Sequence, residues 1–386
     1  MPTKTPKTPA QTKPKTRSPS LLTLFPGYCR RAYQERTAAA DGNVVRELRE
    51  CYLHNGLVLY LGAGVSRSLG LPTWQELIRT LTVTMMSRKV QSAIAALGKM
   101  DDEKYWRVMS TIHEDVEGGA DYEKPILMMA RAIKDELGDD LPMVVARNLA
   151  RHARRARFAH DHDMRMIHRP PEREKYSPIV QAIVTLARSE RDVRGVQAII
   201  NYNYDDLIDE ILREENVRCK TVRSGKDQVG TGVLACYHVH GILPVYKMSQ
   251  GPIHQFNRQL NVGNFVFSED EYHAEYMDPY KWSNMTQMSS LGRHSGLFIG
   301  LSMEDPNIRR LLDVTHRQYP EIRHYAILPR KKPLKKAHDS KECILRNLFE
   351  QVETSSFQKI GVNVIWVDTH DAIPEVLYRI CRMDGQ

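Results

Sequence analysis

The chain has 386 residues, a formal net charge of +8 and six cysteines. This length accommodates one large domain or two ordinary ones, and a composition with 41% hydrophobic and 26% charged residues is typical of a soluble globular protein. No apolar run is long enough for a membrane span, and the first residues lack the apolar segment of a signal peptide. We therefore expect a cytoplasmic protein with no membrane contact.

The cysteines and the charge exclude some classes of protein. The cysteines are scattered without any Cys-x-x-Cys pair, which argues against a disulfide framework and a zinc ribbon. A basic chain can contact nucleic acid. Much of the excess charge, however, lies in two stretches, residues 1–20 with five basic and no acidic residues, and Arg147–Arg157. Such runs are more often solvated faces or flexible arms than readers of DNA.

The amino-terminal part leads into one conspicuous turn. Residues 1–22 are rich in Pro, Thr, Ser and Lys, so we predict a disordered basic tail. A helical pattern follows and ends at Asn55-Gly56, which suit a left-handed cap. The run Leu57–Leu61 is apolar on both faces, as in a parallel strand covered by helices. After it comes Gly62-Ala63-Gly64, and Thr73 is placed to cap the next helix.

The middle of the chain changes character. Residues 86–195 contain few strand-like runs, and their interruptions lie near Gly118-Gly119, Gly138 and Arg169-Pro170-Pro171. We predict a helical insertion here. Its histidines have no convincing ligand spacing, so we assign no metal to them; they are His152, His160, His162 and His168.

Five further apolar runs predict buried strands, and helical patterns separate most of them. They are Val196–Ile200, Leu234–Val239, Leu297–Ile299, His324–Leu328 and Val362–Val367. Alternating strands and helices predict a doubly wound α/β fold with a Rossmann-like parallel sheet and a helical insertion. The Rossmann-like domain would comprise residues 23–85 and 196–386.

The turn Gly62-Ala63-Gly64 has the layout of a dinucleotide-binding turn. Two glycines after a strand let the backbone turn sharply and approach a ligand closely. The start of the following helix offers unpaired N–H groups to a phosphate. The third glycine of the usual G-x-G-x-x-G fingerprint is missing, because Arg67 stands there. A tight turn without a ligand explains the glycine pair equally well.

Four short motifs, in this order, resemble those of the sirtuin-like family, and more narrowly its zinc-less bacterial branch of NAD hydrolases that act in antiphage defence. The resemblance extends from about Leu57 to Ile380 and is uninformative for residues 86–195. The motifs are Gly62-Ala63-Gly64-Val65-Ser66 followed by Gly70-Leu71-Pro72-Thr73-Trp74; Tyr202-Asn203-Tyr204-Asp205-Asp206-Leu207; His240-Gly241; and Phe298-Ile299-Gly300-Leu301-Ser302 followed by Asp305-Pro306-Asn307-Ile308-Arg309.

The resemblance implies that NAD is the substrate and that Asn203 and His240 are catalytic. An amide that donates and accepts could order the water and the ribose hydroxyls, and an imidazole that titrates near neutrality could act as general base. Asp205 would hold the nicotinamide carboxamide. The remaining contacts with NAD would come from Gly62, Ala63, Gly64 and Ser66 at the pyrophosphate, from Gly300 and Ser302 at the adenosine side, and from Thr73.

The two catalytic candidates each have a simpler explanation. Asn203 could bond only the end of its strand, and a histidine before glycine is often structural. Asn201 repeats the Asn-Tyr pair, and His238 is a rival to His240. We favour Asn203 because only it precedes Tyr-Asp, and His240 because a glycine follows it. Asp206 is as suitable for a helix cap as for a ligand.

The resulting hypothesis is an NAD+ hydrolase that releases nicotinamide and ADP-ribose, with no zinc. Sirtuin deacylases typically carry a four-cysteine zinc module, which this sequence lacks. An NAD-dependent protein deacylase and a non-catalytic subunit that senses NAD or ADP-ribose are the alternatives. The resemblance also implies a homo-oligomer, often with a HerA-like ATPase as partner, through which nucleic acid could be contacted.

Overall fold

The structure is a computed structural model that describes residues 42–97, 103, 106–111, 126–166, 176–188, 193–253, 256, 260–330 and 340–381. The predicted tail and two of the predicted interruptions, Gly118-Gly119 and Arg169-Pro170-Pro171, lie outside them. The chain divides into two compact units. One comprises residues 1–40 and 331–353, of which the described part belongs to helix α14 (Ser340–Gln358). The other comprises residues 41–330 and 354–386 and holds the sheet.

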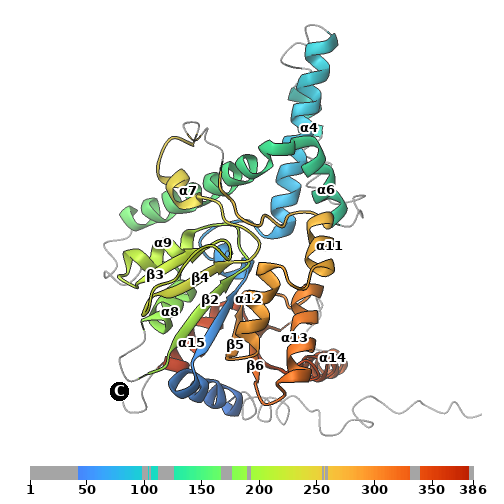
Figure 1. Cartoon of the computed structure of the whole chain (residues 1–386). Helices are drawn as coiled ribbons and strands as arrows, with labels where there is room; N and C mark the ends of the chain where they lie inside the picture. The colour runs from blue at the N-terminus through green and yellow to red at the C-terminus, as the bar shows by residue number, and fades with distance from the viewer. Residues whose placement is uncertain are drawn as a thin grey trace, which may run out of the picture. The chain divides into compact units, whose positions relative to one another are not determined.

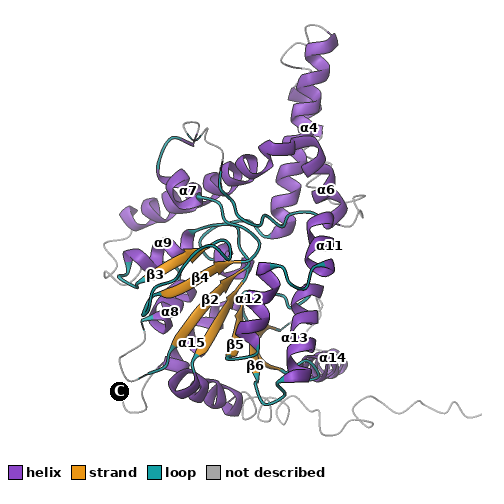
Figure 2. Ribbon diagram, in the orientation of Figure 1, coloured by secondary structure: helices purple, strands orange, loops and turns teal. Residues whose placement is uncertain are grey.

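Within the described residues, seven strands form one parallel sheet in the order β3-β4-β2-β1-β5-β6-β7 (Figure 2). This confirms the predicted doubly wound fold. The strands are β1 (Leu57–Leu61), β2 (Val196–Asn201), β3 (Cys219–Val222), β4 (Leu234–His238), β5 (Ser295–Ile299), β6 (His324–Pro329) and β7 (Val362–Val367). β3 was not predicted, because this four-residue edge strand carries little apolar surface.

The strand order reverses beside β1. The chain passes from β1 to β2 on one side and later returns to place β5 on the other side. Leu61 aligns with Asn201 of β2 and with Ile299 of β5, so the residues that follow these strands meet at one edge of the sheet. In open parallel sheets, this switch point at the carboxyl ends is where ligands bind.

Helices cover both faces of the sheet, since most residues of the central strands are buried and pack on both sides (Figure 1). One face packs against the helix over residues 42–50, the π-helical turn η2 (Cys51–Asn55), α8 (Pro178–Ala187), α9 (Leu207–Glu214) and α15 (Ile373–Cys381). The other face packs against α12 (Trp282–Leu291) and α13 (Pro306–Gln318).

Several helices lie beyond the carboxyl ends of the strands (Figure 1), and a separate apolar cluster holds them together. It joins three helices from the first half of the chain with one from the second half: α4 (Trp74–Leu97), α6 (Ile126–Leu137), α7 (Leu141–Met166) and α10 (Val245–Gln250). The 3-10 turn η3 (Gly138–Asp140) links α6 to α7. No helix in the described part of the chain is both long and apolar enough to traverse a membrane.

The helices between residues 86 and 195 therefore belong to two layers. α4 begins at Trp74 and continues to Leu97, across the predicted boundary at residue 85. α8, which the sequence analysis placed in the insertion, buries six side chains against the sheet. The helical layer at the carboxyl ends is thus built from α4, α6 and α7 together with α10.

Candidate functional site

Two glycine turns are in direct backbone contact at the switch point. The N–H of Gly62 donates to the carbonyl oxygen of Ile299 at 3.0 Å, and the N–H of Gly64 donates to that of Gly300 at 2.9 Å. Gly300 has a φ of +68°, which favours glycine. A Cβ at Gly64 would lie 2.7 Å from the Cα of Gly300, closer than side chains tolerate. These glycines are needed for the two turns to pack together.

The contact between the two turns occupies hydrogen-bond donors that a bound phosphate would need. α3 (Ala63–Arg67), a short helix that was not predicted, begins directly after Gly62. Besides Gly62 and Gly64, the N–H of Val65 is also bonded, to the carbonyl oxygen of Gly62 at 3.0 Å. The buried hydroxyl of Ser66 donates to Asp205 at 2.7 Å. The predicted pyrophosphate cradle at Gly62, Ala63, Gly64 and Ser66 stays a prediction, and the interactions present are intramolecular.

Asn203 connects the ends of β2 and β1. Its side-chain N–H donates to the carbonyl oxygen of Gly62 at 3.0 Å, and its backbone N–H donates to the side-chain oxygen of Asn201 at 3.0 Å. Asn203 retains 7% of its surface exposure, whereas Asn201 retains 1% and has an amide nitrogen without a partner among the described residues. Asn201 thus holds the backbone of Asn203 in place through this hydrogen bond.

Asp205 ties the β1 turn to the start of α9. One carboxylate oxygen accepts the hydroxyl of Ser66 and the other accepts the N–H of Leu207 at 3.2 Å. Burial raises the pKa of Asp205, although both hydrogen bonds oppose that shift. Because both oxygens already have a donor, its role toward a nicotinamide carboxamide remains a prediction.

Asp206 directly precedes α9, but its side chain forms no capping hydrogen bond with that helix. Its carboxylate accepts the N–H of Tyr246 at 2.7 Å and so anchors the first turn of α10. Burial, followed by the charge of Asp205, raises the pKa of Asp206 to about 8.

His238, at the end of β4, belongs to a buried ion pair. Its Nε2 lies 2.9 Å from a carboxylate oxygen of Asp209 on α9, and both side chains are fully buried. The other carboxylate oxygen accepts the hydroxyl of Thr221 at 2.6 Å. Burial alone would lower the pKa of His238, but the charge and hydrogen bond of Asp209 raise it. The opposite ring nitrogen lies 3.4 Å from the carbonyl oxygen of Asn203, so this pair supports the loop that carries Asn203.

His240 has different surroundings, two residues farther along. Its ring meets those of Tyr202 and Tyr272 edge-on, with centroid distances of 5.1 and 5.7 Å, and it retains 7% exposure. Burial lowers its pKa, so the imidazole is neutral at physiological pH. Gly241 has a φ of +94°, and a Cβ there would lie 2.9 Å from the carbonyl oxygen of Val262, which explains the His-Gly pair.

Two other predicted contacts lie at element ends. Thr73 forms a capping box with Glu76: the Thr73 hydroxyl accepts the Glu76 N–H at 3.3 Å, and the Glu76 carboxylate accepts the Thr73 N–H at 2.7 Å. The predicted cap is present. Ser302 is exposed after β5, and the next residue, Met303, is buried with a φ of +60°, which is unusual for a side chain of this size.

Two side chains that contact His240 and Tyr202 lie outside the sequence motifs. Tyr272 comes from α11 (Glu269–Met277), which begins with a capping box formed by Ser268 and Glu271. Tyr202 donates its hydroxyl to Gln287 of α12 at 2.5 Å. Only the tertiary fold brings α11 and α12 to the end of β4, so sequence spacing gives no signal for them.

The described residues contain no group of three or more His, Cys, Asp or Glu side chains that could hold a metal ion. His152 is half-buried on α7, where burial and then the charge of Arg155 lower its pKa. The side chains of His160 and His162, and all of His168, lie outside the described part.

Residues 197–354 match the family model described as a SIR2-like domain. The match begins in β2 and includes Asn203, Asp205, His240, Gly300 and Ser302, whereas the glycine turn after β1 lies outside it. A comparison with curated proteins gives no match. This part of the chain is therefore similar to SIR2-like domains, which indicates an activity related to NAD.

Proposed function

We propose that this protein hydrolyses NAD+ to nicotinamide and ADP-ribose, and that it acts in antiphage defence by depleting NAD. The observation that carries the proposal is the position of Asn203 and His240. They follow β2 and β4, two adjacent strands of a SIR2-like domain, at the edge where the strand order reverses. This is the edge at which parallel sheets bind nucleotides.

The reaction breaks the bond between C1′ of the ribose and the nicotinamide nitrogen. The electron pair of that bond leaves with nicotinamide, which becomes neutral, and a water oxygen forms the new bond to C1′. The proton of that water must go to a base. Positive charge develops on the ribose in the transition state, so the protein has to position the sugar and one water.

His240 suits the role of that base. Burial lowers its pKa, so at neutral pH it is unprotonated and able to accept the proton. The rings of Tyr202 and Tyr272 meet it edge-on and limit the directions in which it can be approached. Asn203 has its amide nitrogen committed to Gly62, which fixes the amide plane and leaves its oxygen as the acceptor for a water or a ribose hydroxyl.

Assembly forms part of the proposal. We propose a homo-oligomer, with a HerA-like ATPase or another defence partner as activator. A single monomeric species in light scattering at micromolar concentration, with full activity, would contradict this part and leave the hydrolase proposal intact.

The test incubates the purified chain with NAD, without a peptide, and measures nicotinamide and ADP-ribose by chromatography. We expect both products, and we expect Asn203→Ala and His240→Ala to reduce their formation by about 100-fold or more. His273→Ala, an exposed histidine on α11, is the matched control.

The outcomes separate the alternatives. Nicotinamide release only with an acylated lysine peptide would favour a deacylase. NAD binding without products, alone and with candidate partners, would favour a sensing subunit. Full turnover in a folded double variant of Asn203 and His240 would refute the assigned roles.

A further inference from the structure

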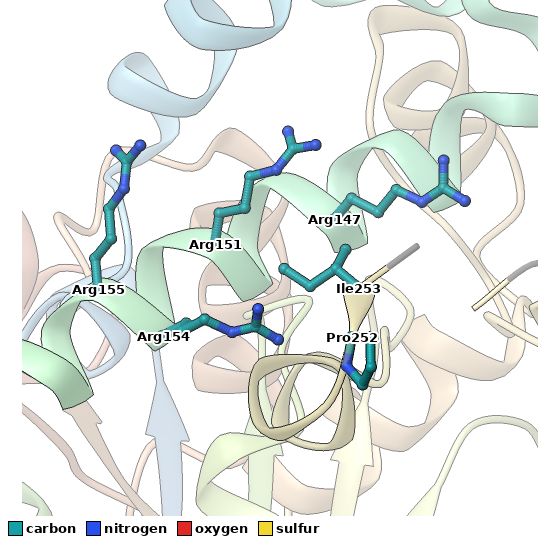
Figure 3. A pocket seen from close by; sticks show the side chains of 6 residues that line it. All are labelled: Arg147, Arg151, Arg154, Arg155, Pro252 and Ile253. Carbon is teal, nitrogen blue, oxygen red and sulfur yellow. The ribbon is translucent and has the colours of Figure 1, made fainter. Parts of the chain in front are cut away.

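A basic groove lies on α7, and none of its lining residues is among those assigned to NAD (Figure 3). Four arginines of one face of the helix line it together with two residues that follow α10, and it has a volume of about 560 Å³. The lining residues are Arg147, Arg151, Arg154, Arg155, Pro252 and Ile253. We call this feature the α7 groove.

Two of these arginines build the wall of the groove. Arg154 donates to the carbonyl oxygens of Met248 at 3.2 Å and Ser249 at 3.0 Å, and also to that of Gly251. It thereby satisfies carbonyl groups at the end of α10, where a cation is favourable. Arg147 donates to the carbonyl oxygen of Phe256 at 3.1 Å. Both interactions fix the segment after α10 against α7.

Arg151 and Arg155 do not take part in fixing this segment. Both are exposed, and neither forms a hydrogen bond or an ion pair with any residue that the structure describes. They are four positions apart, so they lie on the same side of α7, about 6 Å apart along its axis. In Figure 3 their guanidinium groups extend from the helix separately and do not converge on one point.

The sequence around the groove has no counter-charge. Neither Leu141–His160, which contains the arginines, nor Leu243–Ser268, which contains the opposite wall, has an Asp or Glu. Glu76 lies close enough to His152 to affect its pKa, but it is already bonded to Thr73. Unpaired arginines between acid-free walls create a positive potential that a bound anion can neutralise.

We propose that the α7 groove binds the backbone of single-stranded nucleic acid. Guanidinium groups spaced along a helix suit successive phosphates of a strand, whereas one small anion requires donors that converge. Pro252 and Ile253 offer an apolar surface for sugars or bases beside the charges. A single strand can turn its bases toward these apolar residues, whereas the bases of a duplex are stacked inside it. This inference is independent of the proposed NAD hydrolysis.

The test is fluorescence anisotropy with the full chain and labelled oligo(dT) or oligo(U) of about 20 nucleotides, between about 50 and 200 mM salt. The charge-reversing double variant Arg151→Glu/Arg155→Glu should bind both probes about tenfold more weakly or worse. Loss of two phosphate contacts should reduce the salt slope, log Kd against log salt concentration, by about 1.4.

A matched control separates the groove from net charge. Arg79→Glu/Arg293→Glu changes the charge of the chain equally, at two exposed arginines that do not line the groove. We expect less than about a threefold loss of affinity for this variant. A third variant, with the basic residues of positions 1–20 changed to Gln, measures what that segment adds. Thermal melting checks that every variant is folded.

Four results would overturn the proposal. These are equal weakening by both double variants, no binding of either oligonucleotide by the wild-type chain, tighter binding of a duplex of the same length, and displacement of the probe by millimolar phosphate or ADP-ribose. The last would indicate a site for a small anion. Preference for oligo(dT) or oligo(U) would identify the strand as DNA or RNA and would support the proposal in either case.

Discussion

The contact between the two glycine turns makes a sharp prediction for Gly64→Ala. The added methyl group would lie 2.7 Å from the Cα and 3.1 Å from the carbonyl oxygen of Gly300. Carbon atoms pack favourably at about 3.5–4.0 Å, so one turn has to move by about 1 Å. Both contact atoms belong to backbone, and no side-chain rotation can relieve the clash.

The cost has two parts. Overpacking of a rigid site costs about 1–3 kcal/mol. The same displacement strains the hydrogen bond of 2.9 Å from Gly64 to Gly300, which is worth about 1 kcal/mol. We therefore expect Gly64→Ala to lower the free energy of unfolding by about 2–4 kcal/mol.

Urea denaturation followed by circular dichroism measures this loss as a lower midpoint at an unchanged m-value. Gly42→Ala is the control, because a Cβ at Gly42 meets nothing within 4 Å and Gly42 lies in a helix. That control should be neutral or stabilising by up to about 1 kcal/mol. A Gly64→Ala chain within about 0.5 kcal/mol of the wild type would show that the two turns are not in rigid contact.

Three further predictions concern titratable groups. Burial raises the pKa of Asp206 to about 8, so the folded state favours its protonated form, and this stabilisation is lost as pH rises from 3.8 to about 8. Asp206→Asn should therefore flatten the fall in stability over that range in denaturation measured at several pH values, and an unchanged pH profile would contradict the assignment. Because burial lowers the pKa of His240, the midpoint of the acid limb in the pH profile of kcat/KM for NAD should lie below pH 6.5. A midpoint above pH 6.5 would exclude His240 as the base. Asp209→Ala would leave the imidazole of His238 buried without its partner and should cost about 3–5 kcal/mol in urea denaturation. Asp209→Asn, which removes the charge but preserves a hydrogen-bonding side chain, should cost less, and equal losses would show that the hydrogen bond contributes nothing without the charge.

The strands could be predicted because parallel strands covered on both faces are uniformly apolar. β1 is the clearest case, with all five residues buried. β3 escaped prediction because Cys219–Val222 is an edge strand with only Val222 buried. α8 is a different case, since its composition indicates a helix but cannot tell which apolar surface that helix covers. Only the packing of Ile179 and Ile183 against the sheet shows this.

The candidate site was predictable to the extent that it is local in sequence. Asn203 and His240 occur in short motifs at strand ends, and the parallel register then brings those ends to one edge. Partners that arrive through tertiary contacts have no such signal. Tyr272 reaches His240 from α11, and Asp209 supports the loop of Asn203 through His238.

The glycine turn shows why the same residues allow two interpretations. A turn that approaches a phosphate and a turn that approaches another backbone both require the absence of a Cβ, so Gly62 and Gly64 satisfy either. The hydrogen bonds distinguish the two cases. The N–H groups of both glycines donate hydrogen bonds to carbonyl oxygens at the end of β5. A phosphate would have to replace these hydrogen bonds, each of which contributes about 1 kcal/mol. For the proposed binding of NAD at this edge, we therefore expect Asn203 and the exposed Ser302 to contribute more contacts than the glycine amides.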